Sequence, residues 1–441
     1  MHYRGMDRTT TKRAILLCDA GHYGTLAAVR VLGRERVPVT VVHAQRAAPA
    51  LWSRHVTQRV HCPPIADVER FAEWLIRFGE RQPGHVLYAT SDEICFVFSL
   101  YREELAKHFA LFQPEFAVLA RILDKGELLA SARTVGMDLP DTWLPESEDD
   151  VERAAREADG PLLIKPRTQI LLTTHSKGEM APTGPRGLRA AYARFVRFNS
   201  YGDAIKKRMP AAIRPMLQRF YPEAMDAVYS LTGFRSRDGR HFSVLGANKV
   251  LQRPRNLGIG LCFEAAPVDP DLAAKAARLL EQIGYYGAFE LEFIRVGDRW
   301  LLIDYNPRFY NQLALDVARG LPLPQLVYSA ALGQDREVDR LMAGVPPPDA
   351  IATYAFCNQI SLNVLLGAQR IFGAMSPEEV TRWRRWCVSK GNRLVDAVSA
   401  PDDPLPYLAE VTKQVLELVR DPRIFWRVHR PRRELSRPTI D

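Results

Sequence analysis

The sequence predicts a multidomain α/β protein with a doubly wound N-terminal domain, a central part richer in antiparallel strands, and a helical C-terminal extension. Three observations support this fold class. Residues 14–43 alternate between a short apolar strand, a turn, a helix and a second strand. Residues 216–308 contain several strand-like runs separated by hairpin turns. Beyond the prolines at 346–348 the chain reads mostly as helix, which predicts an appended segment.

The composition is that of an ordinary folded protein, with 47% apolar and 25% charged residues in a chain of 441. That length allows two to four domains. We expect no transmembrane segment, because no apolar run approaches the roughly 20 residues that a membrane helix needs. Six cysteines are scattered without a Cys-x-x-Cys pair. This pattern favours a cytoplasmic location and gives no support to a zinc site.

The chain is basic, with a formal net charge of +9. Nucleic-acid binding is one meaning of such a charge, but the arginines are spread along the chain and are not interleaved with aromatics on one element. We therefore expect anionic small molecules rather than nucleic acid as partners. The densest basic run is residues 420–437. Its segment 424–433 predicts a terminal helix that is docked by its aromatics and keeps its arginines in water, and a contact with an acidic partner or lipid headgroups is the alternative.

The N-terminal domain offers polar side chains where its strands end. The apolar run 14–18 is followed by a turn with Gly21 and Gly24, but these two glycines do not form a Gly-x-Gly-x-x-Gly pattern. The strand beginning at 86 leads into Thr90, Ser91 and Asp92. Ligands of open α/β sheets gather at such strand ends, so these residues are candidate substrate contacts. They are equally a normal N-cap for the next helix.

The central part predicts a capped helix, an apolar strand and a loop in succession. Asp124 should cap the helix that runs to 136, and the strand 161–167 carries Lys165. Residues 168–185 are rich in Thr, Ser, Gly and Pro and include Lys177. They read as a mobile loop, either a cover over phosphates or a plain solvent-exposed connection.

Strands are predicted next at 216–221, 227–233 and 242–250, with Lys249 near the end of the third. Arg253 and Arg255 should follow in a loop. There they could bind a substrate carboxylate or simply remain solvated. Residues 269–284 then predict an amphipathic helix.

The most informative segment is the hairpin at 287–308. Its second strand ends in Asp304, Asn306 and Arg308, which share one face because alternate residues of a strand do. Glu290 and Glu292 lie on the preceding strand. Carboxylate and amide oxygens beside a guanidinium favour a site for a hard cation and phosphate. The alternative is a solvated amphipathic hairpin at a sheet edge.

A metal site requires Glu292 to lie opposite Asp304. A two-residue turn at Gly297 and Asp298 would place Ile303 there instead. A three-residue loop that includes Arg299 pairs the two carboxylates directly. The metal hypothesis therefore predicts a loop of odd length, while Glu290 is an alternative carboxylate partner on the same face.

These pieces, taken in order, resemble the ATP-grasp superfamily of carboxylate–amine or carboxylate–thiol ligases. The motifs are Asp124-Lys125, Ile164-Lys-Pro166, a Gly/Ser loop, Gln218, Glu292-Phe293 and Asp304-x-Asn306-Pro-Arg308. The resemblance covers roughly residues 14–335 and lies nearer to D-aspartate ligases than to biotin carboxylase. It implies four parts: a pre-ATP-grasp domain, a small lobe with a flexible phosphate loop, a large lobe with the metal hairpin, and the helical extension (1–122, 123–217, 218–345 and 346–441).

The resemblance also implies roles for individual residues. ATP phosphates would be held by Lys125 and Lys165, with Lys177 in the covering loop, while Arg308 and Lys165 would be catalytic. Adenine would bind at Gln218, Phe220 and Tyr221, and the ribose at Asp226. One or two Mg²⁺ ions, with Mn²⁺ as an alternative, would be bound by Glu292, Asp304 and Asn306. Asp304 departs from the family's usual glutamate and is one methylene shorter, which leaves the metal count open.

The activity implied is ATP-dependent amide formation, in which a carboxylate is activated as an acylphosphate and joined to an amine. The partners would be a small-molecule acid and amine, and the candidate substrate contacts are Ser91, Asp92, Lys249 and Arg253. A non-catalytic ATP-binding module of the same fold is the alternative. The C-terminal extension could cover the active site, bind a carrier or form a homodimer.

Overall fold

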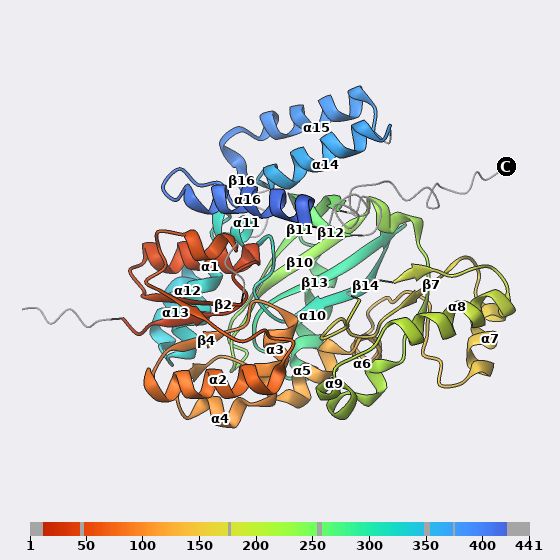
Figure 1. The fold of residues 1–441 in the computed structure, drawn as a ribbon, viewed down its shortest axis with the longest axis horizontal. Coiled ribbons are helices and arrows are strands. Elements are labelled where there is room, and N and C mark those ends of the chain that lie inside the picture. The colour runs from red at the N-terminus through yellow and green to blue at the C-terminus, as the bar shows by residue number, and fades with distance from the viewer. Residues whose placement is uncertain are drawn as a thin grey trace, which may run out of the picture.

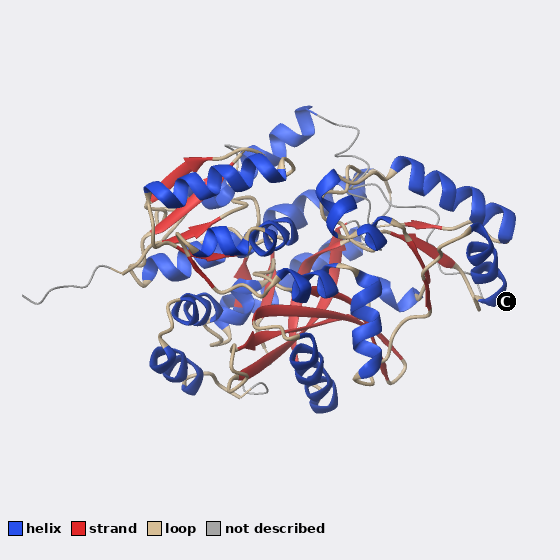
Figure 2. Ribbon diagram, turned by 90° about the horizontal axis from the view of Figure 1, so that it is seen from below, coloured by secondary structure: helices blue, strands red, loops and turns tan. Residues whose placement is uncertain are grey.

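The computed structural model describes residues 12–44, 48–174, 178–253, 258–347, 353–373 and 375–420. Three sheets of five, four and seven strands organise these residues. Figure 1 shows the N-terminal domain in red and orange, the small sheet with its helices at the opposite end, and the large sheet between them. Helices cover the sheets from several sides, as Figure 2 shows by secondary structure. The predicted fold class is confirmed.

The N-terminal sheet is parallel throughout and has the strand order β3-β2-β1-β4-β5. Its β1 strand is entirely apolar because helices cover both faces of such a sheet. The order reverses between β1 and β4, which makes their carboxyl ends the expected ligand edge. The strands are β1 (Ile15–Leu17), β2 (Val39–His43), β3 (Gln58–His61), β4 (Val86–Tyr88) and β5 (Ala110–Leu111), and the helices are α1 (Tyr23–Arg34), α2 (Val68–Arg81), α3 (Asp92–Leu100), α4 (Arg102–Ala106) and α5 (Phe116–Leu123).

The small sheet has the order β6-β9-β7-β8, and an apolar cluster joins it to helices α7 and α8. Strand β9 spans the expected lobe boundary at 217/218 and belongs to this sheet. The elements are β6 (Thr142–Trp143), β7 (Leu162–Lys165), β8 (Glu179–Met180), β9 (Met216–Arg219), α6 (Lys125–Thr134), α7 (Glu148–Glu157), α8 (Pro185–Phe198) and α9 (Asp203–Arg208).

The large sheet has the order β14-β13-β10-β11-β12-β15-β16 and is antiparallel except at its β15–β16 edge. Its long strands cross the middle of the molecule (Figure 1). The elements are β10 (Val228–Arg235), β11 (Phe242–Arg253), β12 (Ile259–Ala266), β13 (Gly287–Val296), β14 (Arg299–Asn306), β15 (Ala355–Cys357), β16 (Leu394–Asp396), α10 (Pro270–Ile283), α11 (Leu313–Ala318), α12 (Leu323–Ala331) and α13 (Asp335–Ala343). Arg253 was expected in a loop but is the last residue of β11.

The C-terminal extension is mostly helical, as predicted, but it is not only an appendage. It contributes β15 and β16 to the large sheet, alongside α14 (Gln359–Ile371), α15 (Pro377–Lys390) and α16 (Leu405–Arg420). The segment before α16 is tied to the N-terminal domain by buried Asp403. This carboxylate accepts hydrogen bonds from Arg30 Nε at 2.9 Å, Ser53 Oγ at 2.7 Å and the Arg54 backbone N–H at 2.9 Å. The extension therefore adds strands to the large sheet and is hydrogen-bonded to the N-terminal domain.

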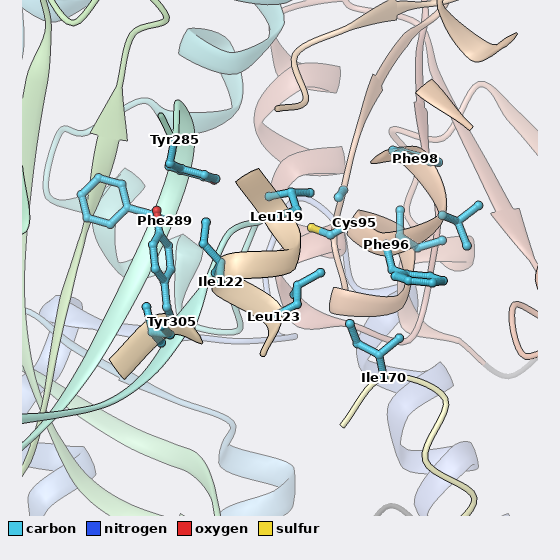
Figure 3. Packing of buried hydrophobic residues seen from close by; sticks show 14 of the residues in the cluster. Cys95, Phe96, Phe98, Leu119, Ile122, Leu123, Ile170, Tyr285, Phe289 and Tyr305 are labelled. Atoms are coloured by element: carbon cyan, nitrogen blue, oxygen red, sulfur yellow. The ribbon is translucent and has the colours of Figure 1, made fainter. Parts of the chain in front are cut away.

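One apolar core joins the N-terminal domain to the large sheet. Figure 3 shows Tyr285, Phe289 and Tyr305 facing Leu119 and Ile122 of α5, with side chains of α3 beyond them. All these side chains are buried. Because β13 and β14 pack on this core, the polar hairpin face is held in a fixed position relative to α3.

Two smaller features concern the cysteines and the membrane expectation. All six cysteines lie within the described ranges and are free thiols, and Cys18, Cys95 and Cys262 are buried. No helix in the described part of the chain is both long and apolar enough to span a bilayer.

Candidate functional site

Glu292 and Asp304 lie directly opposite each other in the β13–β14 pair. The predicted three-residue loop is wrong, because Val296 pairs with Arg299 across a two-residue turn at Gly297 and Asp298. The register shifts between Glu292 and Phe293, so that Ile303 is the extra residue of a β-bulge. A one-residue bulge moves the following side chains to the other face, and it therefore produces the same pairing that the loop was meant to supply.

Each of the two carboxylates is paired with a lysine from another element. Lys249 of β11 donates to Glu292 Oε1 at 2.7 Å, and Lys125 at the start of α6 pairs with Asp304. Burial lowers the pKa of Lys249, but the Glu292 carboxylate outweighs this and raises that pKa overall. Lys249 was expected among the substrate contacts, but in the structure it pairs with Glu292, a predicted metal ligand. The two lysines therefore neutralise the Glu292 and Asp304 carboxylates, which is what a bound metal ion would do.

A second pair on the same face joins Glu290 to Asn306. The two residues are opposite in register, and Asn306 Nδ2 donates to Glu290 Oε2 at 2.9 Å. Glu290 also accepts from Ser230 Oγ at 2.9 Å and from Gln312. Burial, followed by the charge of Glu292, raises the pKa of Glu290 to about 7. Glu290 is therefore occupied with Asn306 rather than opposite Asp304.

Arg308 extends this chain toward the N-terminal domain. Its Nη2 donates to Asn306 Oδ1 at 2.8 Å, while its Nε donates to Asp92 Oδ1 at 2.6 Å. Burial lowers the pKa of Arg308, but Asp92 outweighs this and raises it above its usual range. Asp92 lies in the first turn of α3, and Ser91 caps that helix by accepting from the Ile94 N–H. Ser91 is therefore the N-cap of α3, while Asp92 is the first residue of that helix and contacts a candidate catalytic arginine.

The position of Lys125 is fixed by the residue before it. Asp124 caps α6 by accepting from the Gly126 N–H at 2.9 Å, as predicted. Arg167, which the sequence did not single out, donates to both Asp124 oxygens at 2.7 Å. A Cβ at Gly126 would come within 2.6 Å of that guanidinium, so a glycine lets the arginine reach the cap. Lys125 is the first residue of α6, and the contacts of Asp124 therefore fix its position.

Lys165 and Gln218 meet across the small sheet. Lys165 Nζ donates to Gln218 Oε1 at 3.0 Å, and Gln218 Nε2 donates to Thr142 Oγ1 at 3.1 Å. A pocket between the small and large sheets is lined by both residues. It brings together eight predicted site residues: Lys125, Lys165, Gln218, Phe220, Tyr221, Lys249, Glu292 and Asp304. Gly178, which falls within the predicted loop 168–185, lines it as well.

Other predicted residues lie elsewhere. Asp226 follows a short 3-10 turn, Pro222–Met225, and does not line this pocket. Arg253 ends β11 and also lies outside the pocket lining. Lys177 and Arg255 lie outside the described residues. The pocket contains Gln169 and Gln252, which sequence analysis missed because neither belongs to a motif.

The donor set fits a hard divalent cation. Two facing carboxylates and a neighbouring amide are the oxygen ligands that Mg²⁺ uses together with substrate phosphates. Within the described ranges no cluster of three or more His, Cys, Asp or Glu side chains could hold a metal. Glu292, Asp304 and Asn306 could therefore hold an ion only if phosphate oxygens and water complete its shell.

The fold and this pocket can now be set against known proteins. No family model and no curated protein matches the chain. Among solved structures, the biotin carboxylase domain of Hydrogenobacter thermophilus 2-oxoglutarate carboxylase, solved with MgADP, ADP and bicarbonate, is similar with a TM-score of 0.57 at 14% identity over 72% of this chain and 69% of that one. This chain has an ATP-grasp fold.

Two further ATP-grasp structures are similar. The L-amino acid ligase of Bacillus licheniformis has a TM-score of 0.54 at 13% identity, over 73% of this chain and 75% of that one. The N5-carboxyaminoimidazole ribonucleotide synthetase of Thermus thermophilus has a TM-score of 0.50 at 18% identity, over 72% of this chain and 78% of that one. At these identities the similarity concerns the ATP-grasp fold alone, so chemistry has to be argued from this chain's own residues.

Proposed function

We propose that this protein is an ATP-dependent ligase that activates a carboxylate as an acylphosphate and joins it to an amine. The observation that carries the proposal is the pocket between the two sheets, where Lys125, Lys165, Glu292 and Asp304 converge. Two ammonium groups suit a polyphosphate, and two facing carboxylates suit the metal ion that accompanies it. The sequence resemblance to D-aspartate ligases supports amide formation within this class of reactions.

Each residue then has a defined task. Gln218, Phe220 and Tyr221 contact the adenine end, and Lys125 and Lys165 bind the phosphates. A magnesium ion bound by Glu292, Asp304 and Asn306 would neutralise charge on the phosphate oxygens. Arg308, anchored by Asp92, stabilises the phosphoryl group as it moves to the substrate carboxylate. Because ion pairs now hold Lys125 and Lys249, nucleotide binding must exchange these contacts for phosphate and metal.

The second half of the reaction needs no further nucleophile from the protein. The neutral amine nitrogen attacks the acyl carbon, the carbon–oxygen bond to phosphate breaks, and phosphate leaves with that electron pair. The nitrogen loses a proton and an amide results. Positioning and electrostatic stabilisation supply most of the acceleration in such a scheme.

A non-catalytic ATP-binding module is the second candidate, and one observation favours it. Both carboxylates of the candidate metal site are already neutralised by lysines. In addition, the side chain of Asp304 is one methylene shorter than the glutamate usual in the family. The purified full-length chain should be given ATP, Mg²⁺ and a panel of acid–amine pairs, with ADP and product mass measured. The ligase predicts ADP together with a product whose mass is the sum of acid and amine minus water. Nucleotide binding without ADP release for every pair would favour the module.

A further inference from the structure

A second pocket, of about 790 Å³, lies at the carboxyl ends of β1 and β2. Three separate parts of the chain line it: the N-terminal domain, residues 171–173 of the small lobe, and Lys413 of α16. Most of its wall is apolar, including Val42, Ala48, Ile65, Phe71, Leu171 and Leu172. A pocket of this size and character suits a small molecule with an apolar body.

One carboxylate in this wall lacks a cationic partner. Glu93 lies in the first turn of α3 and lines the pocket, and it forms no ion pair with any residue that the structure describes. Burial, followed by the neighbouring charge of Asp92, raises the pKa of Glu93 to about 7. Ionised carboxylates are costly to remove from water unless a cation compensates them. A positively charged group that entered the pocket would supply this compensation.

The other charged side chains of the wall are engaged. Asp19 lies 3.3 Å from the His22 ring, and Lys413 lies 3.8 Å from Glu410. Because Asp19 and Glu93 both line the pocket, an anionic ligand is disfavoured beside them. An ammonium group fits this arrangement, whereas a carboxylate placed at Glu93 would be repelled.

The pocket adjoins the candidate catalytic arginine. Asp92, adjacent to Glu93 on α3, binds Arg308, and the charge of Arg308 influences the pKa values of both Glu93 and His22. One loop borders both pockets, because Gln169 lines the nucleotide pocket while Leu171 and Leu172 line this one. A molecule bound at Glu93 would therefore lie on the Arg308 side of the loop, next to the site of acyl activation.

We propose that this second pocket is the amine-substrate site and that it selects an amine with an apolar body, whose ammonium group pairs with Glu93. The inference rests on the proposed ligase function for the identity of the reaction, but binding itself does not require turnover. The ammonium group gives one proton to water before its neutral nitrogen attacks. Helix α16 forms part of the pocket wall through Lys413.

Binding should be measured first, in the absence of ATP. Hexylamine, 1-hexanol and hexanoate share one apolar chain and differ in the head group. Calorimetric titration of the full-length protein at about pH 8 should give the tightest binding for hexylamine, since its ammonium group is charged there. Glu93→Gln should weaken hexylamine binding by about tenfold and leave 1-hexanol unchanged. Glu69→Gln, an exposed glutamate in the first turn of α2, is the matched control and should behave as wild type.

The apolar wall is tested separately. A Cβ at Gly21 would meet nothing closer than 3.7 Å, so Gly21→Leu should fold and place its side chain in the pocket. We expect this variant to lose hexylamine binding by about tenfold. Gly367→Leu is the control, because Gly367 is exposed on α14 with open space around it. Equal or tighter binding of hexanoate by wild type, or unaltered hexylamine binding by Glu93→Gln and Gly21→Leu, would overturn the inference.

Turnover then separates the two proposals. ADP formation with a panel of acids should be faster with hexylamine than with ethanolamine, and Glu93→Gln should raise the KM for the amine while leaving the KM for ATP unchanged. Activity with ethanolamine that exceeds activity with hexylamine would refute the pocket assignment but keep the ligase. Hexylamine binding at Glu93 without ADP formation for any pair would keep the pocket and refute the ligase.

Discussion

Glu292 and Asp304 face each other across the β13–β14 pair, and lysines from two other elements neutralise them. Lys249 reaches Glu292 from β11, whereas Lys125 reaches Asp304 from the first turn of α6. Neither carboxylate is therefore left as an uncompensated charge beside the pocket. In the proposed complex, phosphate would replace the carboxylate partners of Lys125 and Lys249, and a metal ion would replace the lysine partners of Asp304 and Glu292. This exchange underlies the first prediction.

Asp304→Asn should abolish the magnesium dependence of nucleotide binding. The substitution removes one of the two facing carboxylates and leaves Lys125 without its counter-charge. We expect the affinity for a non-hydrolysable ATP analogue in the presence of Mg²⁺ to fall by at least about tenfold, measured by calorimetry. Asp298→Asn, at the exposed turn of the same hairpin, is the control. Wild-type magnesium dependence in Asp304→Asn would remove this residue from the metal site.

Arg308→Ala should lower kcat far more than it raises the KM for ATP. The guanidinium bridges Asn306 and Asp92, where it can stabilise charge that develops during phosphoryl transfer. We expect kcat to fall by about 100-fold, with the KM for ATP changed by less than about threefold. Arg299→Ala provides an exposed arginine at the start of β14 for comparison. A change confined to the KM for ATP would make Arg308 a ground-state binding residue instead.

The stability of the folded protein should decrease as the pH rises, because Glu93 loses its proton. Its pKa is raised from an ordinary 4.5 to about 7 in the folded chain. Between these values the folded state retains a proton that the unfolded state has released, so the contribution of Glu93 to stability decreases as pH rises and is fully lost above about 7. The melting temperature of wild type should therefore drop more between about pH 5 and pH 8 than that of Glu93→Gln. Parallel pH profiles for the two proteins would contradict the raised pKa, and Glu69→Gln should follow wild type.

Asp403 should contribute far more to stability than its neighbour Asp402. Asp403 is buried and accepts from Arg30, Ser53 and the Arg54 N–H, whereas Asp402 pairs with Arg34 at the surface. We expect Asp403→Ala to lower the free energy of unfolding by about 3–5 kcal/mol, because it leaves the Arg30 charge buried without a partner. Asp402→Ala should cost less than about 1 kcal/mol. Similar losses in denaturant unfolding would show that the C-terminal segment is not anchored at Asp403.

The sequence was sufficient for features that depend on neighbours along the chain. The Asp124 cap, the apolar β1 strand and the shared face of Asp304 and Asn306 follow from local periodicity and capping chemistry, whereas Arg308 lies beyond the end of β14. The resemblance to the ATP-grasp superfamily implied that Lys125, Lys165, Gln218 and Glu292 share a site, and these four residues line one pocket. Nucleotide binding in that pocket is a proposal.

Features that depend on strand pairing could not be predicted from the sequence. Turn length alone did not give the correct register, because the bulge at Ile303 compensates for the short turn. The Lys249–Glu292 pair spans strands on either side of β10, and no sequence spacing encodes that neighbourhood. Strands β15 and β16 have three residues each, too few for a period-2 pattern to be recognised. Glu93 was overlooked because its pocket is assembled from three distant segments.

The central claim is that the β13–β14 hairpin binds the metal of a metal–nucleotide complex. A crystal structure with a non-hydrolysable ATP analogue and Mn²⁺, with the metal located by its anomalous signal, tests this most directly. The account predicts a manganese peak bound by oxygens of Glu292 and Asp304, phosphates at Lys125 and Lys165, and adenine beside Gln218 and Tyr221. A nucleotide bound in another part of the molecule, or a manganese peak that contacts neither carboxylate, would contradict it.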